Sequence, residues 1–321
     1  MLRVGIVGLG GWGKRLVDSV QGKSDKIAFV TAVTRHPDKI KAFCDKHGMT
    51  ATADLAQMLG DKTIDAVVSA GPAKLHAPHA LAAVRAGKHA LVIKPYAVTR
   101  AEADELNQAA KKANRLAVLG YNRCFMPPVV ELRKRVAAGA LGTLLHAEGN
   151  FCVYRYGDLD PDDWKADRDQ VLAGSLADHM LYGLIETLGP VAEVHALAAT
   201  HVAPVPIADT TAVLLRFRNG TSGLLTAIGM TAEDYRLQVF GSKGWIELRG
   251  TGQFKFQPVE GKAEIIDFPK FDAERAELEA FAAAVAGEAP FPFSVENAVH
   301  SAVVLEAMDQ SARLGKPVVL S

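Results

Sequence analysis

A glycine-rich turn between an apolar run and a helical pattern constrains this chain more than any other feature. Residues 4–7 predict a buried strand, residues 12–20 predict a helix, and a Gly-x-Gly-x-x-Gly motif lies between them. In such a turn the first glycine permits the tight bend, the second lets the backbone approach a pyrophosphate, and the third lets the helix pack on the strand. The motif therefore predicts a dinucleotide site that includes Gly8, Gly10, Gly11, Trp12 and Gly13.

Strand-like and helix-like segments alternate over the first third of the chain. Further strands are expected at 27–33, 65–68, 89–93 and 116–120, and helices at 37–48, 78–86 and 101–114. This alternation is typical of parallel strands that are joined by right-handed crossovers, with helices on both faces of the sheet. Residues 1–122 are therefore expected to form a doubly wound α/β domain of the Rossmann type.

The pattern changes after about residue 122. A helix over 128–138 precedes strand-rich sequence, in which Asn219-Gly220 predicts a hairpin turn between 212–218 and 222–228. Further turns are expected at 241–244 and 260–261, helices at 273–286 and 295–314, and a closing strand at 317–320. A chain of 321 residues suits two domains, so residues 123–321 are expected to form an α+β domain with an open, mainly antiparallel sheet.

Composition excludes several classes of function. The 36 Lys and Arg residues balance the 36 Asp and Glu residues, so no overall field attracts nucleic acid or an anionic membrane. No apolar stretch approaches the roughly 20 residues that span a bilayer, and no signal peptide is evident. The three cysteines show no metal-binding or redox spacing, which indicates a reduced, cytoplasmic protein.

The end of the second expected strand bears on the choice of dinucleotide. An acidic residue there would bind the ribose hydroxyls of NAD, whereas an arginine accepts the 2′-phosphate of NADP. This chain has Thr34 and Arg35 and no carboxylate at that position. A hydroxyl and a guanidinium suit a phosphate, so NADP is favoured, with NAD as the alternative.

Four further motifs complete a resemblance to a known family. They are Pro-Ala-Lys-Leu-His at 72–76, His-Ala-Leu-Val-Ile-Lys-Pro at 89–95, Gly-Tyr-Asn-Arg at 120–123 and Gly-Ser-Leu-Ala-Asp at 174–178. With the glycine turn, they resemble the glucose–fructose oxidoreductase / inositol dehydrogenase / MocA family over nearly the whole chain. The resemblance implies an NAD(P)-dependent oxidoreductase that acts on a CH–OH group of a sugar, polyol or cyclic diol. It also places Pro72 and His76 beside the nucleotide.

Lys94 is the first expected catalytic residue, and it is expected to contact the cofactor as well. The family has Glu-Lys-Pro at the end of the fourth strand; here Ile93 replaces the glutamate, while Lys94 and Pro95 match. Ligands bind at the carboxyl ends of parallel strands, and a following proline keeps the preceding residue extended. The replacement by Ile93 removes a carboxylate partner for the lysine.

The resemblance also places an aspartate and a proton-transfer group in one helix. Asp178 matches the family's aspartate, and the residue four positions later is Tyr182, as in the tyrosine-bearing members. Residues four apart share one helix face, so both side chains can reach one pocket. A different gap placement would instead assign the catalytic role to His179.

Hydride transfer from an alcohol requires removal of the hydroxyl proton. Tyr182 can do this if a nearby ammonium such as Lys94 lowers its pKa from the usual value near 10, and it is the preferred candidate. His179 has an ordinary pKa close to neutrality and is the alternative. Asp178 would orient the substrate or the lysine.

The substrate is expected to be a small molecule. Several cations in segments that can border the substrate crevice would suit an anionic one, with a neutral sugar as the alternative: Arg123, Arg155, Lys165 and Arg168. No metal site is expected, because His76 and His79 lack a third ligand nearby, and the acidic run at 158–169 departs from the calcium-loop pattern.

Two other functions fit the same motifs. One is a hydrolase or lyase that retains its nicotinamide cofactor and redox-cycles it within each turnover; the other is a non-catalytic nucleotide-binding regulator. In every case an open sheet has a face that needs covering, so a homodimer or higher homo-oligomer is expected.

Overall fold

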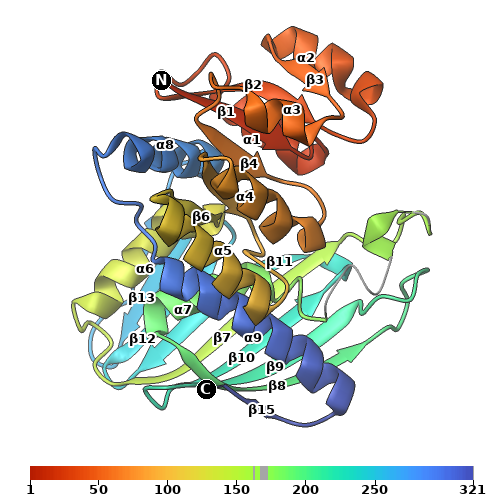
Figure 1. Cartoon of the computed structure of the whole chain (residues 1–321). Helices are drawn as coiled ribbons and strands as arrows, with labels where there is room; N and C mark the ends of the chain where they lie inside the picture. Colours follow the sequence, from red (N-terminus) through yellow and green to blue (C-terminus); the bar gives the residue numbers. More distant parts are fainter. Residues whose placement is uncertain (162, 167–172, 321) are drawn as a thin grey trace. The chain divides into compact units, whose positions relative to one another are not determined.

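The computed structural model describes residues 1–161, 163–166 and 173–320, which form two compact units (Figure 1). Unit 1 comprises Met1–Asn122 and Asp272–Ala302, and unit 2 comprises Arg123–Phe271 and Val303–Ser321. The chain thus passes between units at residue 122, where the second domain was expected to begin. The two units differ from the two consecutive domains expected, because residues 272–302 belong to unit 1.

Unit 1 contains a parallel sheet with the strand order of dinucleotide-binding domains, as expected for a Rossmann-type fold. Its order is β3-β2-β1-β4-β5-β6 in the described residues, and each neighbouring pair is parallel. The strands are β1 (Leu2–Val7), β2 (Ile27–Val33), β3 (Thr50–Thr52), β4 (Ala66–Ser69), β5 (His89–Ile93) and β6 (Ala117–Gly120). The order reverses between β1 and β4, which is the point where ligands bind in open α/β sheets.

The helices of unit 1 follow the expected pattern closely. They are α1 (Gly11–Val20), α2 (Lys41–His47), α3 (Leu55–Gly60), α4 (His76–Arg85), α5 (Arg100–Ala113) and α8 (Ala273–Ala286). The helix expected over 37–48 begins as a 3₁₀ turn at Pro37–Ile40, while β3 and α3 were not anticipated.

Helix α8 belongs to unit 1 because it contributes to that unit's core. Leu278 and Phe281 are fully buried in one cluster with Val4, Ile6 and Leu16. Burying a large apolar side chain stabilises a fold by roughly 1.5–3 kcal/mol, so these two residues hold α8 against the sheet. The sequence does not predict this packing, because α8 is far along the chain from the residues that it contacts.

Unit 2 contains a nine-stranded sheet in the described residues, and it is mainly antiparallel as expected. Its order is β14-β13-β12-β11-β7-β10-β9-β8-β15, and only β7 and β10 pair in parallel among the pairs described. The strands are β7 (Leu144–Tyr154), β8 (Val191–Ala199), β9 (Thr210–Phe217), β10 (Ser222–Ile228), β11 (Met230–Gly241), β12 (Gly244–Arg249), β13 (Gln253–Pro258), β14 (Glu264–Asp267) and β15 (Val318–Val319).

One face of this sheet packs against helices. Alternate residues of the strands point to this face, so Val213 and Leu215 are buried while Leu214 between them is 55% exposed. The covering helices are α6 (Pro127–Ala137), α7 (Asp178–Leu188) and the later part of α9 (Val295–Leu314), which lie above the sheet in Figure 1. Among the described helices, none combines the length and apolar character needed to cross a bilayer.

Candidate active site

The glycine turn lies at the reversal point of the parallel sheet. Gly8 follows β1 with φ of 94°, a left-handed conformation that favours glycine. A Cβ atom at Gly8 would lie 2.5 Å from the backbone nitrogen of Gly71, which follows β4. The backbones after β1 and β4 therefore approach each other so closely that a side chain at Gly8 cannot fit.

The remaining glycines of the turn have two different roles. A Cβ atom at Gly13 would overlap the carbonyl oxygen of Gly8, so this glycine lets α1 pack on the turn. At Gly10 and Gly11 a Cβ atom would meet no described protein atom within 4 Å. The N-terminus of α1 is thus open at these two positions, and its unpaired N–H groups can receive a phosphate there. Trp12, beside them, is 37% exposed and lies next to Arg15, whose guanidinium is 5.3 Å from the ring centroid.

These two roles predict different effects of the same substitution. Gly10→Ala should leave the melting temperature unchanged and weaken dinucleotide binding at least about tenfold, because the new methyl group occupies the space open to the phosphates. Gly13→Ala should instead destabilise the fold by about 1–3 kcal/mol, because α1 must move away from Gly8. Thermal unfolding and cofactor titration of both variants test this, and equal effects on both measurements would contradict it.

His76 ties together the loops that follow β4 and β5. Its Nδ1 lies 2.9 Å from the carbonyl oxygen of Pro95 and its Nε2 lies 2.8 Å from that of Gly71. Burial of the ring lowers the pKa of His76 to about 4, so the ring is neutral at pH 7. A neutral imidazole has one N–H, so it donates to one of these carbonyls and leaves the other contact without a proton. Pro72, the other residue expected near the nucleotide in this loop, caps the 3₁₀ turn Ala73–Leu75 that leads into His76.

Lys94 directly follows β5 and is half-buried at the carboxyl edge of the same sheet. Its peptide bond to Pro95 is cis, and the Pro95 carbonyl faces His76. Ile93, which replaces the family's glutamate, packs against the apolar core of unit 1. Unit 1 therefore gathers the glycine turn, His76 and Lys94 along one edge of its sheet.

The expected specificity residues lie at the end of β2. Thr34 is half-buried and Arg35 is exposed directly after the strand. The guanidinium is therefore available to a ligand that reaches this strand end.

In unit 2, the expected catalytic residues lie in the first turn and a half of α7. Asp178 is its first residue, and Asp178 and Tyr182 are 3% and 0% exposed, which agrees with their sharing one face of the helix. His179 is half-buried instead, and its ring stacks on Phe151 with centroids 4.5 Å apart and an interplanar angle of 21°.

The surroundings of Tyr182 differ from those expected for an activated phenol. Burial strongly raises the pKa of Tyr182, and the Glu186 carboxylate nearby raises it further, with Arg133 opposing this. Glu186 itself pairs with Arg133 at 3.3 Å. These neighbours therefore favour the protonated phenol.

Arg123 contacts two aromatic rings, and neither of them was among the residues expected at the site. Its guanidinium carbon is 4.9 Å from the ring centroid of Phe151 and 4.5 Å from that of Tyr235. Phe151 on β7 and Tyr235 on β11 are register partners on the helix-covered face of the sheet. No local pattern reveals this contact, because it depends on the pairing of β7 with β11.

The other cations expected to border the substrate crevice have different surroundings. Arg155 is exposed and Lys165 pairs with Asp163 at 3.4 Å, while Asp162, Arg168 and Asp169 lie outside the described residues. Within the described ranges, no three His, Cys, Asp or Glu side chains gather as a metal site.

Sequence comparison identifies both halves of the chain. Residues 2–121 match the GFO_IDH_MocA profile, described as an oxidoreductase family with an NAD-binding Rossmann fold. Residues 129–247 match the profile described as the GFO/IDH/MocA C-terminal domain. The two matches lie on either side of the change in sequence pattern at residue 122.

Individual relatives agree with these matches. Myo-inositol 2-dehydrogenase of Thermotoga maritima is 27% identical over 256 residues, which cover 76% of this chain and 74% of that protein. D-xylose dehydrogenase of Paenarthrobacter nicotinovorans is 32% identical over 178 residues, 53% of this chain and just under half (46%) of that protein. The solved structure of levoglucosan dehydrogenase with NADH and L-sorbose shares the fold, with a TM-score of 0.87, 21% identity, and coverage of 100% of this chain and 99% of that one.

Proposed function

Since the chain belongs to the glucose–fructose oxidoreductase / inositol dehydrogenase / MocA family, we propose that it is an NAD(P)-dependent dehydrogenase of a sugar, polyol or cyclic diol. The observation that carries this proposal is the edge of unit 1, where Gly10 and Gly11 leave the N-terminus of α1 open and Lys94 follows β5. When bound, a nicotinamide dinucleotide supplies the acceptor or donor of the hydride. The relatives named for myo-inositol and D-xylose support the substrate class.

Side chains of the protein would stabilise the reacting oxygen, orient the substrate and accept the proton. Lys94 would donate a hydrogen bond to the reacting oxygen, which stabilises the charge that develops there. Asp178 would orient the substrate hydroxyl or the lysine. His179 is the better supported proton acceptor, because it is half-buried and its ordinary pKa lies near neutrality, whereas the surroundings of Tyr182 raise the pKa of that phenol. Tyr182, which the sequence favoured, is the alternative.

The direct experiment is a search for substrate oxidation. The purified protein is mixed with NADP⁺ or NAD⁺ and a panel of sugars, inositols and cyclic diols, and reduction of the nicotinamide is followed by absorbance. We expect reduction with at least one polyol. A protein that binds neither dinucleotide would overturn the proposal, and a tightly retained cofactor with turnover but no net reduction would favour the hydrolase or lyase alternative.

NADP is proposed as the preferred dinucleotide, on the basis of Thr34 and Arg35 at the end of β2. Arg35→Ala should weaken NADP⁺ binding about 10- to 150-fold, the range for a hydrogen bond to a charged group, and leave NAD⁺ binding unchanged. Calorimetric titration of both dinucleotides measures this. Tighter NAD⁺ binding by the unsubstituted protein would instead assign NAD.

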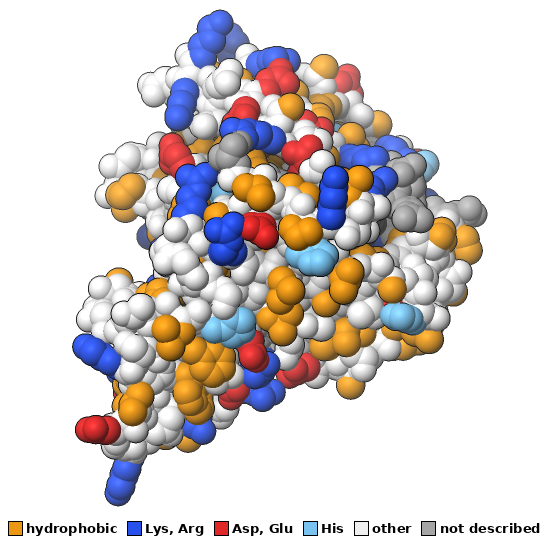
Figure 2. Space-filling view, turned by 90° about the horizontal axis from the view of Figure 1, so that it is seen from below, with side chains coloured by type: hydrophobic (Ala, Val, Ile, Leu, Met, Phe, Trp, Pro, Cys, Tyr) orange, Lys and Arg blue, Asp and Glu red, His pale blue; other side chains and the backbone are white. Residues whose placement is uncertain are grey.

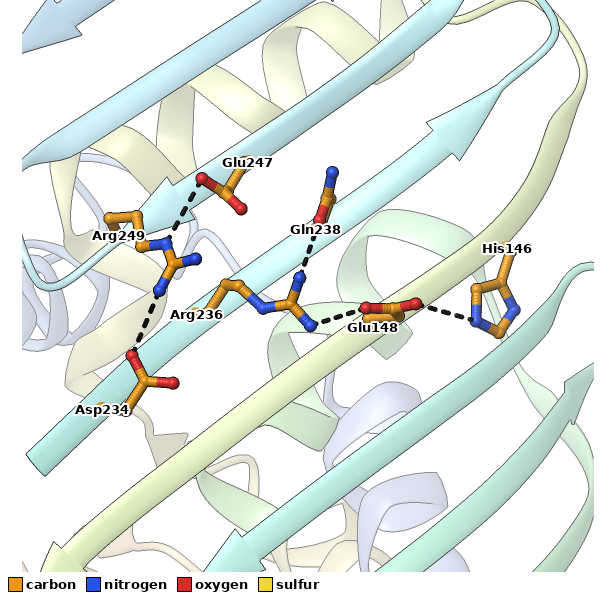
Figure 3. A network of polar contacts seen from close by, with 7 residues as sticks. All are labelled: His146, Glu148, Asp234, Arg236, Gln238, Glu247 and Arg249. Carbon is orange, nitrogen blue, oxygen red and sulfur yellow. Dashed lines mark hydrogen bonds and ion pairs between the residues drawn. The ribbon is translucent and has the colours of Figure 1, made fainter. Parts of the chain in front are cut away.

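A homo-oligomer is proposed because the second face of the unit 2 sheet exposes apolar side chains. Leu197 and Leu214 are 63% and 55% exposed, and Figure 2 shows hydrophobic groups gathered among charged ones on the side viewed from below. The centre of this face is polar: Arg236 binds Glu148 at 2.6 Å and Gln238 at 2.9 Å (Figure 3). A monomeric mass in solution at micromolar concentration would refute the proposal.

The cytoplasm is proposed as the compartment in which the protein works. In the described residues none of Cys44, Cys124 and Cys152 forms a disulfide, as is usual for thiols in a reducing environment. Recovery of the native protein in the membrane or secreted fraction of its source cells would contradict this.

A further inference from the structure

Arg123 is held in a fixed position at the start of unit 2. It lies in the 3₁₀ turn Asn122–Phe125, and its guanidinium packs against the rings of Phe151 and Tyr235, which form what we call the aromatic corner. These two rings meet edge to face, with centroids 6.4 Å apart and an interplanar angle of 86°. Contact with two aromatic faces orients a guanidinium without neutralising it, and arginine keeps its charge at all working pH values.

The charge of Arg123 has no carboxylate partner among the described residues, in contrast to the other half-buried arginines of unit 2. Arg133 pairs with Glu186 at 3.3 Å, Arg135 with Glu264 at 2.7 Å, and Arg236 with Glu148 at 2.6 Å. Half-buried charges are costly unless an opposite charge or hydrogen bonds compensate them. One of its N–H groups donates a hydrogen bond to the Tyr235 hydroxyl, and because a guanidinium has five N–H groups, others remain as donors to a ligand.

The aromatic corner also adjoins a candidate catalytic residue. Phe151 contacts Arg123 with its ring and stacks on the ring of His179, which follows Asp178 at the start of α7. One aromatic ring therefore separates the uncompensated guanidinium from the proposed proton acceptor. Both groups lie within unit 2, on the helix-covered face of its sheet.

We propose that Arg123 binds a carboxylate of the substrate, so that the enzyme acts on acidic polyols such as sugar acids or carboxylated cyclic diols. This inference rests on the proposed dehydrogenase function and names its substrate class. A planar carboxylate matches the two parallel N–H groups of a guanidinium. A carboxylate fits better than a phosphate dianion, because Arg123 offers a single positive charge, while the other half-buried arginines described in unit 2 are already paired with carboxylates.

The test compares matched acidic and neutral ligands. Binding of D-glucuronate and D-glucose, and of D-galacturonate and D-galactose, is measured by calorimetry on the protein saturated with NADP⁺, and oxidation of each is followed by absorbance. We expect the acid of each pair to bind more tightly. Arg123→Met should weaken acid binding about 30-fold or more, as expected for loss of one partner of a buried charge pair, and change binding of the neutral sugar less than threefold.

Two control variants distinguish ligand binding by Arg123 from a purely structural role of this residue. Arg218→Met removes an exposed arginine at the β9–β10 hairpin and should leave the ratio of acid to neutral binding unchanged. Arg123→Lys keeps the charge but loses the planar fork, so it should recover only part of the acid preference. A purely structural role of Arg123 would lower the melting temperature and affect both ligands of a pair equally.

Each outcome decides between the two proposals. Neutral sugars that bind as tightly as their acids to the unsubstituted protein would overturn the carboxylate inference, and their oxidation would leave the dehydrogenase proposal intact. An Arg123-dependent preference for acids without turnover of any ligand would support the binding inference and count against the proposed reaction.

Discussion

Replacing Lys94 by methionine should reduce turnover by about 10²- to 10⁴-fold, the range for loss of a group that acts on the reacting proton or charge. Methionine retains most of the length of the side chain but cannot donate a hydrogen bond. Because Lys94 follows β5 while the phosphates are expected at Gly10 and Gly11 after β1, dinucleotide affinity should change little. Steady-state kinetics combined with calorimetric titration of the cofactor measure both quantities.

Lys112→Met is the matched control for this variant, because Lys112 is an exposed lysine on α5. It should leave both turnover and cofactor affinity unchanged. A Lys94→Met enzyme with normal turnover would remove Lys94 from the mechanism. Loss of cofactor binding without loss of turnover at saturation would make it a binding residue only.

The same kinetic assay separates the two candidates for proton transfer. If His179 accepts the proton, His179→Gln should lower turnover and abolish its rise with pH near neutrality, while Tyr182→Phe should retain a normal pH profile. The reverse result would return the role to Tyr182, in spite of the burial and the Glu186 carboxylate that raise the pKa of its phenol.

Stability of unit 1 should fall as pH rises, because α8 buries a carboxyl group. Glu277 is 1% exposed, and its Oε2 has no hydrogen-bond partner among the described residues. Burial, with the nearby Glu274 carboxylate adding to it, raises the pKa of Glu277 well above its usual value. The folded protein therefore holds this proton at pH values where the unfolded chain has released it.

The sign of the effect follows from the number of protons bound in each state. Below the ordinary pKa of glutamate, both states are protonated and this group contributes no pH dependence. Above it, the unfolded chain binds fewer protons than the folded one, so the free energy of unfolding falls by up to about 1.4 kcal/mol per pH unit until pH passes the raised pKa.

Glu277→Gln should remove this loss, because the amide has the same shape and carries no charge at any pH. Urea unfolding at several pH values above 5 should show the advantage of the variant growing as pH rises. Glu288→Gln, which changes an exposed carboxylate just beyond the same helix, is the control and should show no such trend. An advantage that does not vary with pH would mean that Glu277 is ionised in the folded state.

Much of unit 1, including the backbone of its glycine turn, could be predicted from the sequence. The positions of Gly8, Gly10 and Gly13 between a strand and a helix require a particular backbone, and the structure shows that backbone with a left-handed Gly8 and a crowded Gly13. The alternation of strands and helices likewise predicted a parallel sheet, which is observed. Lys94 was placed correctly at the end of β5, because strand ends are marked by local sequence.

Other features required the tertiary structure. The sequence of residues 273–286 predicted a helix, yet it did not indicate that α8 would join unit 1 or bury Glu277. Arg123 was only one of several candidate cations until the pairing of β7 with β11 placed Phe151 and Tyr235 beside it.

There is a physical reason why some features could be predicted from the sequence and others could not. Turn geometry, helix periodicity and strand ends depend on residues that are neighbours in the chain, so the sequence by itself determined the Rossmann-type sheet, the glycine turn and the position of Lys94. The pKa of Tyr182 and Glu277 and the aromatic contacts of Arg123 depend on burial and on groups that are distant in the chain. Only packing brings those groups together, and so only the tertiary structure decided them.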